Sequence, residues 1–134
     1  MLVAYTDGSF SSKTGKVGWG FVLLNGDTVI HEDYGSIDEY TEMRNVVGEC
    51  YAMIQLVSYC EEQGITDLLC YVDYQGVKCW YEGTWRCKNE MTQRYRRFML
   101  GSPINIQIEW VRGHDGNKWN EYVDGLAKRG SGLE

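Results

Sequence analysis

The stretch FVLLNGDTVIH, residues 21–31, predicts a β-hairpin and with it the first half of the fold. Its centre, Asn25-Gly26, is a dipeptide typical of a tight hairpin turn, and apolar residues lie on both sides of it. Strands are therefore expected over 17–24 and 28–31, and a further apolar run predicts a strand over 2–6. The chain should begin with three antiparallel strands.

Beyond residue 40 the spacing of apolar residues changes to that of helices. A helix with Thr41 as its N-cap is expected over 42–61. A strand over 68–72, two helices within 74–100 broken near Gly83, a strand around 104–108 and a helix over 119–128 are expected to follow. This order predicts an α/β domain with a mixed sheet. The helix between the first and fourth strands implies that these two strands run parallel.

Composition narrows the class of protein. A chain of 134 residues with 43% apolar content fits one domain, which we expect over residues 1–130, with 131–134 as a tail. Five cysteines without a C-x-x-C pair argue against a disulfide framework or a zinc site. No apolar run approaches the ~20 residues of a membrane span, and the first residues, MLVAYTDGS, show no basic stretch followed by an apolar signal core. We expect a cytoplasmic monomer without a membrane partner.

The net charge of −6 by itself counts against binding to nucleic acid, but the charge is unevenly distributed. Six of the thirteen basic residues lie between Lys78 and Arg97, with two acids among them, so this basic stretch carries +6 − 2 = +4. The rest of the chain then carries −6 − 4 = −10. The basic stretch is therefore the expected contact for phosphates.

Two acids are expected where the ligand site of an α/β sheet lies. Asp7 and Asp73 each follow an expected strand, and ligands bind outside the carboxyl ends of such strands. If the strands are neighbours, ~4.8 Å apart, both carboxylates can reach one cation. The alternative is that each acid is an ordinary turn residue. Glu49 lies at the edge of the apolar stripe of its helix, where a surface ion pair is the alternative.

The segment RGHDGNKWNEYVDGLAKRG, residues 112–130, adds further candidates. Asp124 follows Asn120 by four residues and shares its helix face, and His114 lies in a glycine-bounded loop that can bend over that face. Capping or packing of the loop is the alternative for His114. Clustered acids with few imidazoles suit Mg²⁺ or Mn²⁺ rather than zinc. Together the candidates indicate a two-metal phosphodiester site.

Four segments resemble type 1 ribonuclease H. They are Tyr5-Thr-Asp7-Gly-Ser9, Asn45 with Glu49, Val72-Asp73, and Gly113-His114-x-Gly116-x-x-x-Asn120-Glu121-x-x-Asp124. The resemblance covers essentially the whole chain and is strongest to a bacterial branch often fused to a viroplasmin-like hybrid-binding module. It implies a ribonuclease H-like fold, with a five-stranded mixed sheet in the order 3-2-1-4-5 flanked by helices.

The resemblance also implies an activity, which is hydrolysis of the RNA strand of RNA–DNA hybrids with two Mg²⁺ ions, for which Mn²⁺ can substitute. The implied metal ligands are Asp7, Glu49, Asp73 and Asp124, while His114 would assist proton transfer or product release. The implied or expected substrate contacts are Gly8, Ser9, Asn45, Gln75, Trp80, Trp85, Arg86, Lys88 and Asn120. The remaining alternatives are a two-metal nuclease of this fold acting on DNA and a non-catalytic hybrid-binding domain.

The chain departs from the common family pattern in two places. Tyr74 replaces a small residue after the third acid, and the long basic handle is reduced to residues 83–90. Neither change affects a metal ligand. Both bear on substrate affinity, which a fused or separate hybrid-binding module could supplement.

Overall fold

The structure, a computed structural model, describes residues 1–113 and 116–132. Within them, five strands form one mixed sheet in the order β3-β2-β1-β4-β5. The elements in chain order are β1 (Leu2–Phe10), β2 (Val17–Asn25), β3 (Thr28–Ile37), η1 (Thr41–Met43), α1 (Asn45–Glu62), β4 (Asp67–Val72), α2 (Gln75–Glu82), α3 (Glu90–Gly101), β5 (Asn105–Trp110) and α4 (Lys118–Gly130). The expected order of elements and the parallel pairing of β1 with β4 are confirmed.

The antiparallel part of the sheet is longer than the apolar pattern predicts. β1 continues past residue 6 because its backbone remains paired with β2 as far as Phe10↔Val17. β3 continues to Ile37 for the same reason, although its side chains are mostly exposed. Backbone pairing with a neighbouring strand therefore outweighs the weak strand preference of these polar stretches.

The start of α1 differs from the prediction. Thr41 begins a 3₁₀ turn rather than capping the helix, and the N-cap is Arg44, which makes no side-chain capping bond. Tyr40 and Arg44 both have a φ of 55°, which turns the chain on each side of η1. Positive φ is uncommon for residues other than glycine, so spacing alone could not locate this double turn.

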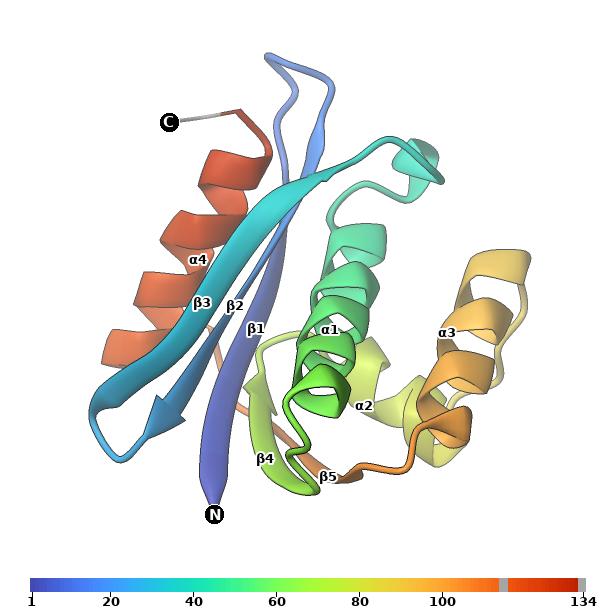
Figure 1. Ribbon diagram of the computed structural model, residues 1–134. Coiled ribbons are helices and arrows are strands. Elements are labelled where there is room, and N and C mark those ends of the chain that lie inside the picture. The colour runs from blue at the N-terminus through green and yellow to red at the C-terminus, as the bar shows by residue number, and fades with distance from the viewer. Residues whose placement is uncertain (114–115, 133–134) are drawn as a thin grey trace.

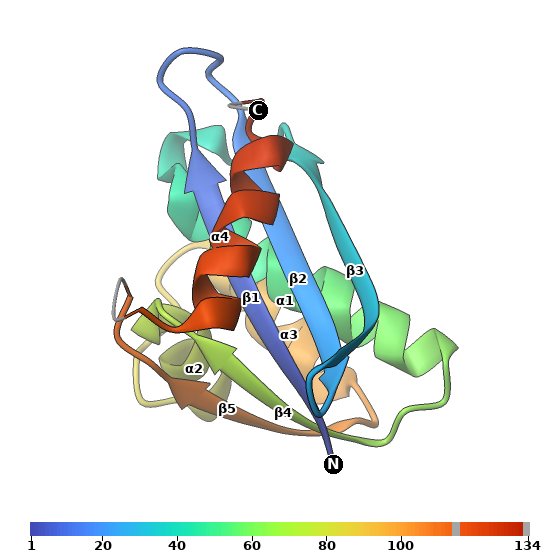
Figure 2. The same cartoon turned by 90° about the vertical axis from the view of Figure 1, so that its left-hand side faces the viewer.

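Helices cover both faces of the sheet (Figure 1). α4 lies on one face, where Gly18 and Gly20 of β2 allow it to approach closely: a Cβ on Gly18 would lie 2.1 Å from the Ala127 carbonyl oxygen. Figure 2 shows α4 crossing in front of β1 and β2. On the other face, α1 and α3 cover the larger core cluster, which includes Met53, Leu56 and Tyr95.

α1 approaches β1 through two glycines. A Cβ on Gly8 would lie 2.3 Å from the Glu49 backbone nitrogen, and one on Gly48 would lie 3.1 Å from the Gly8 Cα. Side chains at these positions would force the helix away from the strand. This contact brings the first turns of α1, with Glu49, next to Asp7.

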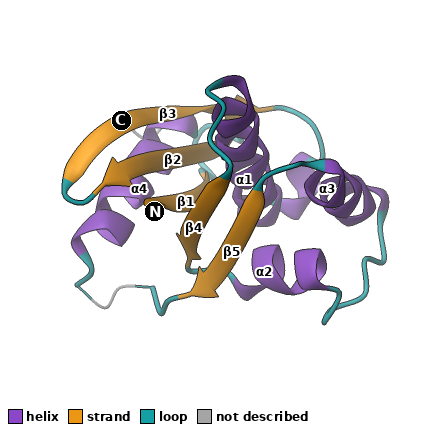
Figure 3. Ribbon diagram, turned by 60° about the horizontal axis from the view of Figure 1, so that its bottom comes forward, coloured by secondary structure: helices purple, strands orange, loops and turns teal. Residues whose placement is uncertain are grey.

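The segment between β4 and β5 contains the two expected helices. α2 ends at Gly83, whose φ is 86°, and α3 begins with a capping box between Asn89 and Thr92. Figure 3 shows β4 and β5 side by side, with α2 next to β5. None of the helices in the described part of the chain is long and apolar enough to cross a membrane.

The packed chain extends past residue 130. Ser131, which we expected in the tail, is fully buried, and its carbonyl oxygen accepts a 2.6 Å hydrogen bond from the Thr14 hydroxyl. The side chain of Ser131 also donates to the Lys128 carbonyl oxygen. The last turn of α4 is thus attached to the loop between β1 and β2.

Candidate active site

Three carboxylates converge at the point where β1 and β4 stop pairing. The last parallel pair is Tyr5↔Tyr71, and Asp7 and Asp73 each lie two residues beyond it. Glu49 approaches from α1 across the contact at Gly8. One carboxylate oxygen from each of the three lies within 4.8 Å of the others. The sequence-predicted convergence of these acids is therefore present, although Asp7 lies inside β1 rather than after it.

These acids are buried to different extents. Glu49 is 2% exposed and Asp7 is 4% exposed, whereas Asp73 is half-buried. Burial raises the pKa of Glu49 well above its ordinary value, and the nearby Asp7 carboxylate raises it further. Burial likewise raises the pKa of Asp7. Without a cation, Asp7 and Glu49 thus hold protons more tightly than ordinary carboxyl groups do.

Asp124 is placed beside this group rather than within it. Its proximity contributes to the raised pKa of Asp7. One of its oxygens forms a 3.0 Å ion pair with Lys128, one turn further along α4, and its side chain is 34% exposed. The fourth predicted acid therefore lies near the site, where a cation would compete with Lys128 for it.

The donor set fits a hard divalent cation. Three carboxylates supply only oxygen ligands, as Mg²⁺ and Mn²⁺ prefer. The Glu49 Oε2 atom is buried without a hydrogen-bond partner among residues 1–113 and 116–132. A buried acceptor without a partner costs about 1–3 kcal/mol. A cation bound to Asp7, Glu49 and Asp73 would satisfy this oxygen and offset the repulsion among the acids.

Asp73 is held by the end of β5 and the residues after it, through contacts that the sequence pattern did not predict. The indole nitrogen of Trp110 donates to the Asp73 carbonyl oxygen at 3.0 Å, and the Val111 amide donates to the Val72 carbonyl oxygen at 2.8 Å. A Cβ on Gly113 would lie 3.2 Å from the Asp73 Oδ2 atom. Trp110 thus fixes the backbone of Asp73, and Gly113 leaves room for its carboxylate.

The model of the RNase H family matches residues 1–132. The chain belongs to the ribonuclease H family. The ribonuclease H of Dinoroseobacter shibae is 33% identical to it over 144 residues, which cover 96% of this chain and 90% of that protein. The expected membership of the ribonuclease H family is thereby confirmed.

Solved structures of the ribonuclease H family share the fold. RNase H1 from the halophilic archaeon Halobacterium salinarum matches with a TM-score of 0.82 at 23% identity, covering 99% of this chain and 98% of that one. LC11-RNase H1, solved in complex with an RNA/DNA hybrid, matches with a TM-score of 0.76 at 17% identity, covering 100% of both chains. The expected strand order 3-2-1-4-5 is confirmed.

In this member of the ribonuclease H family, an aromatic cluster adjoins the third acid. It consists of Tyr74, Trp80 and Trp85, whose ring centroids lie 5.8–6.5 Å apart. A Cβ on Gly76 would lie 2.4 Å from the Tyr74 ring and 2.9 Å from the Trp80 ring, so only glycine leaves the rings in place. The cluster therefore extends the site from Asp73 along α2 to the loop after it.

Other candidate substrate contacts are distributed around the acids. Asn45 and Gln75 are exposed first residues of α1 and α2. Arg86 and Lys88 are exposed and line, with Trp80 and Trp85, a cleft of about 520 Å³. We had expected Gly8 as a substrate contact, and it packs against the first turns of α1, while Ser9 is half-buried.

Asn120 and His114 complete the set of sequence candidates. Asn120 is 5% exposed, and its Oδ1 atom is buried without a partner in the described part of the chain. Burial of this amide one turn before Asp124 was not apparent from the sequence. His114 lies outside the described residues, so its predicted role stays a prediction.

Proposed function

We propose that this chain hydrolyses the RNA strand of RNA–DNA hybrids, using two divalent cations held by Asp7, Glu49, Asp73 and Asp124. Membership of the ribonuclease H family supports the activity and the substrate. The observation that carries the assignment to these residues is the convergence of three carboxylates, two of them buried, where β1 and β4 diverge. Mg²⁺ is the proposed ion, with Mn²⁺ as a substitute.

The acids have different parts in this proposal. The contact between β1 and α1 holds Asp7 and Glu49 inside the fold, so these two ligands would bind the cations from fixed positions. Asp73 and Asp124, which are both half-buried, would complete the set of metal ligands. When bound, the two cations stabilise the charge on the attacking and leaving oxygens of the phosphodiester. His114 assists proton transfer or product release from its loop.

Recognition of the hybrid is proposed to use the groups around the acids. RNA differs from DNA by its 2′-hydroxyls in a wide minor groove, which polar side chains and backbone amides can bind. Asn45 and Gln75, exposed next to Glu49 and Asp73, suit that task. The remaining proposed contacts are Gly8, Ser9, Trp80, Trp85, Arg86, Lys88 and Asn120. We propose that the chain acts as a monomer, with or without a hybrid-binding module.

The proposal is tested by incubating the purified chain with labelled RNA–DNA hybrid, duplex RNA and duplex DNA, each with Mg²⁺, Mn²⁺ or EDTA. We expect cleavage of the RNA strand of the hybrid alone, and only with a divalent cation. Asp73→Asn is expected to abolish it, since a neutral amide replaces an anionic ligand. Cleavage of duplex DNA would support a different nuclease, and hybrid binding without turnover would support a binding domain.

A further inference from the structure

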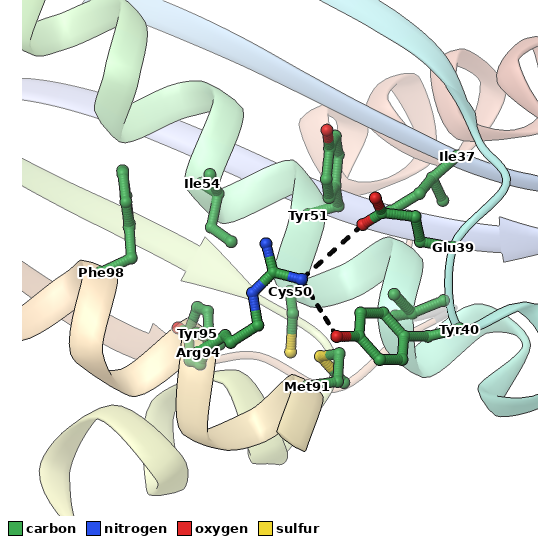
Figure 4. A pocket seen from close by; sticks show the side chains of 11 residues that line it. Ile37, Glu39, Tyr40, Cys50, Tyr51, Ile54, Met91, Arg94, Tyr95 and Phe98 are labelled. Atoms are coloured by element: carbon green, nitrogen blue, oxygen red, sulfur yellow. Dashed lines mark hydrogen bonds and ion pairs between the residues drawn. The ribbon is translucent and has the colours of Figure 1, made fainter. Parts of the chain in front are cut away.

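A hollow of about 290 Å³ lies between α1 and α3, apart from the carboxylates (Figure 4). Its walls come from α1, α3 and the end of β3, and residues 39 and 40 lie at its mouth. Among the described residues, none of the proposed metal ligands or substrate contacts lines it. The proposed function therefore leaves this feature unexplained, and we call it the α1–α3 hollow.

The interior of the α1–α3 hollow is apolar. Tyr95 is fully buried, and its hydroxyl donates to the Val77 carbonyl oxygen at 2.7 Å, so the polar end of this side chain already has a partner. Burial raises the pKa of the Cys50 thiol well above its ordinary value, so the thiol stays protonated and uncharged. Such walls suit the apolar body of a ligand.

The side chains of the interior favour an aromatic ligand over an aliphatic one. Three of them carry rings and two carry sulfur; they are Tyr51, Tyr95, Phe98, Met91 and Cys50. Aromatic rings pack edge-to-face or offset with one another, and thioether sulfur makes favourable contacts with ring edges. A single aromatic ring therefore matches the chemistry of these walls.

Arg94 provides a cation at the mouth of the α1–α3 hollow. Its Nη1 atom donates to the Tyr40 hydroxyl at 3.0 Å, whereas Glu39 lies 3.9 Å away, beyond hydrogen-bond distance. Both charged side chains are more than half exposed, at 53% and 61%, so their pairing is weak. The other N–H groups of Arg94 bond no residue in the described part of the chain. A ligand carboxylate could thus replace Glu39 and bond this guanidinium more closely.

Tyr40 keeps the guanidinium of Arg94 near the mouth. The guanidinium carbon lies 5.9 Å from the centroid of the Tyr40 ring, and Figure 4 shows Arg94 directed toward Tyr40 and Glu39. The φ of Tyr40 is 55°, which is uncommon for a residue of this size. Backbone held in such a conformation is found most often at ligand sites and switch regions. The mouth therefore has a positioned cation above an apolar interior.

We propose that the α1–α3 hollow binds a small aromatic carboxylic acid. The ring lies between α1 and α3, and the carboxylate bonds Arg94 in place of Glu39. The volume is at the lower end of the roughly 300–1,000 Å³ of ligand sites, so the ligand has one ring and a short chain. This site goes beyond the proposed hydrolysis of hybrids and does not rest on it.

The test is a titration of the full chain, free of metal and in a carboxylate-free buffer, followed by methyl NMR of its isoleucine residues. The probes are 4-phenylbutyrate, the uncharged 4-phenyl-1-butanol, and acetate. For the first, with about 12 non-hydrogen atoms, we expect one site with a Kd of about 0.1–1 mM. The methyl signals of Ile37 and Ile54, which line the hollow, should shift, while that of the exposed Ile30 should not. The alcohol should bind about tenfold more weakly, and acetate should not bind measurably.

Four variants locate the site and its charge. Arg94→Gln should weaken 4-phenylbutyrate about tenfold and leave the alcohol unchanged. Arg97→Gln, a control that removes the same charge from the same helix outside the hollow, should bind as wild type. Glu39→Gln removes the competing carboxylate and should tighten 4-phenylbutyrate about twofold to threefold. Ile54→Phe fills the hollow and should weaken both ring-containing probes.

Other results would overturn the proposal. Equal affinities for the acid and the alcohol, or equal losses in Arg94→Gln and Arg97→Gln, would remove the carboxylate from the ligand class. Absence of binding up to several millimolar would make the hollow a solvent-filled depression. Wild-type affinity in Ile54→Phe would place the probe elsewhere on the chain. If thermal unfolding shows that Ile54→Phe does not fold, the changes at the exposed Arg94 and Glu39 still decide.

Discussion

Glu49 shows how a single buried carboxylate can serve function at the expense of stability. It is almost fully buried beside Asp7, and its Oε2 atom has no partner in the described part of the chain. A hydrophobic helix stripe would normally exclude such a group. A bound cation would give this oxygen a partner, so the metal-free protein should be locally destabilised here.

The first prediction concerns Glu49→Gln. Because the amide removes a buried charge next to Asp7, we expect the metal-free free energy of unfolding to rise by about 1 kcal/mol, or roughly 4 °C in Tm. Hybrid cleavage should be lost at the same time. Thermal unfolding in EDTA and turnover with Mg²⁺ measure the two effects. Asp38→Asn, which removes the same charge at an exposed position, is the control; unaltered turnover in Glu49→Gln would make Glu49 a structural residue.

At the scale of elements, α2 combines a weak start with a strong side contact. Its N-cap is Tyr74, which makes no side-chain capping bond, although serine, threonine, asparagine and aspartate are the preferred residues there. The Tyr74 ring instead packs against Trp80 and Trp85. The helix therefore lacks a cap but gains an ordered aromatic surface next to Asp73.

The second prediction compares Tyr74→Ser with Tyr74→Phe. Serine supplies a capping oxygen, worth about 1 kcal/mol, but removes the ring that orders the two tryptophans. We expect Tyr74→Ser to keep its thermal stability within about 1 kcal/mol while its KM for hybrid rises several-fold and its tryptophan emission changes. Tyr74→Phe keeps the ring and should match wild type. A wild-type KM in Tyr74→Ser would show that the aromatic cluster does not contribute to substrate binding.

The order of strands and helices could be predicted from the sequence, but the start of α1 and one contact at the site could not. The Asn25-Gly26 hairpin and the apolar periodicity were enough for the order of strands and helices along the chain, since turn chemistry and burial are local signals, whereas the order of strands in the sheet was implied by the family resemblance. The start of α1 was not predictable, because Arg44 adopts a positive φ that its residue type disfavours. The bond from Trp110, at the end of β5, to the carbonyl oxygen of Asp73, which follows β4, joins residues far apart in the sequence, and no local pattern encodes such a contact.

At the scale of the whole molecule, the protonation of the buried carboxyl groups makes the free energy of unfolding depend on pH. The folded pKa values of Asp7 and Glu49 are raised, so the folded metal-free chain binds more protons than the unfolded chain above about pH 4. The stability that these groups contribute is present below their unfolded pKa values. It is lost as the pH rises through the folded values.

The third prediction follows from this loss of stability at higher pH. In EDTA, the stability advantage of Glu49→Gln over wild type should grow as the pH is raised from about 5 to about 8. At the upper end of this range, saturating Mg²⁺ should restore the stability of the wild-type protein, because the cation binds the folded state alone. Urea unfolding at several pH values measures both effects. A pH-independent difference between the two proteins would mean that Glu49 titrates normally.

The contact between Gly8 and Gly48 has a consequence for mutational tolerance. In a saturation library selected for activity, these two positions should be as intolerant as Asp7 and Asp73, although neither glycine has a side chain to contribute to chemistry. Alanine at either position would need space already occupied by backbone: its Cβ would lie 2.3 Å from the Glu49 nitrogen at position 8 and 2.4 Å from the Gly18 carbonyl oxygen at position 48. Gly125, with nothing within 4 Å of its Cβ position, should accept alanine freely. A library in which Gly8 and Gly125 tolerate alanine equally would show that α1 can shift without moving Glu49.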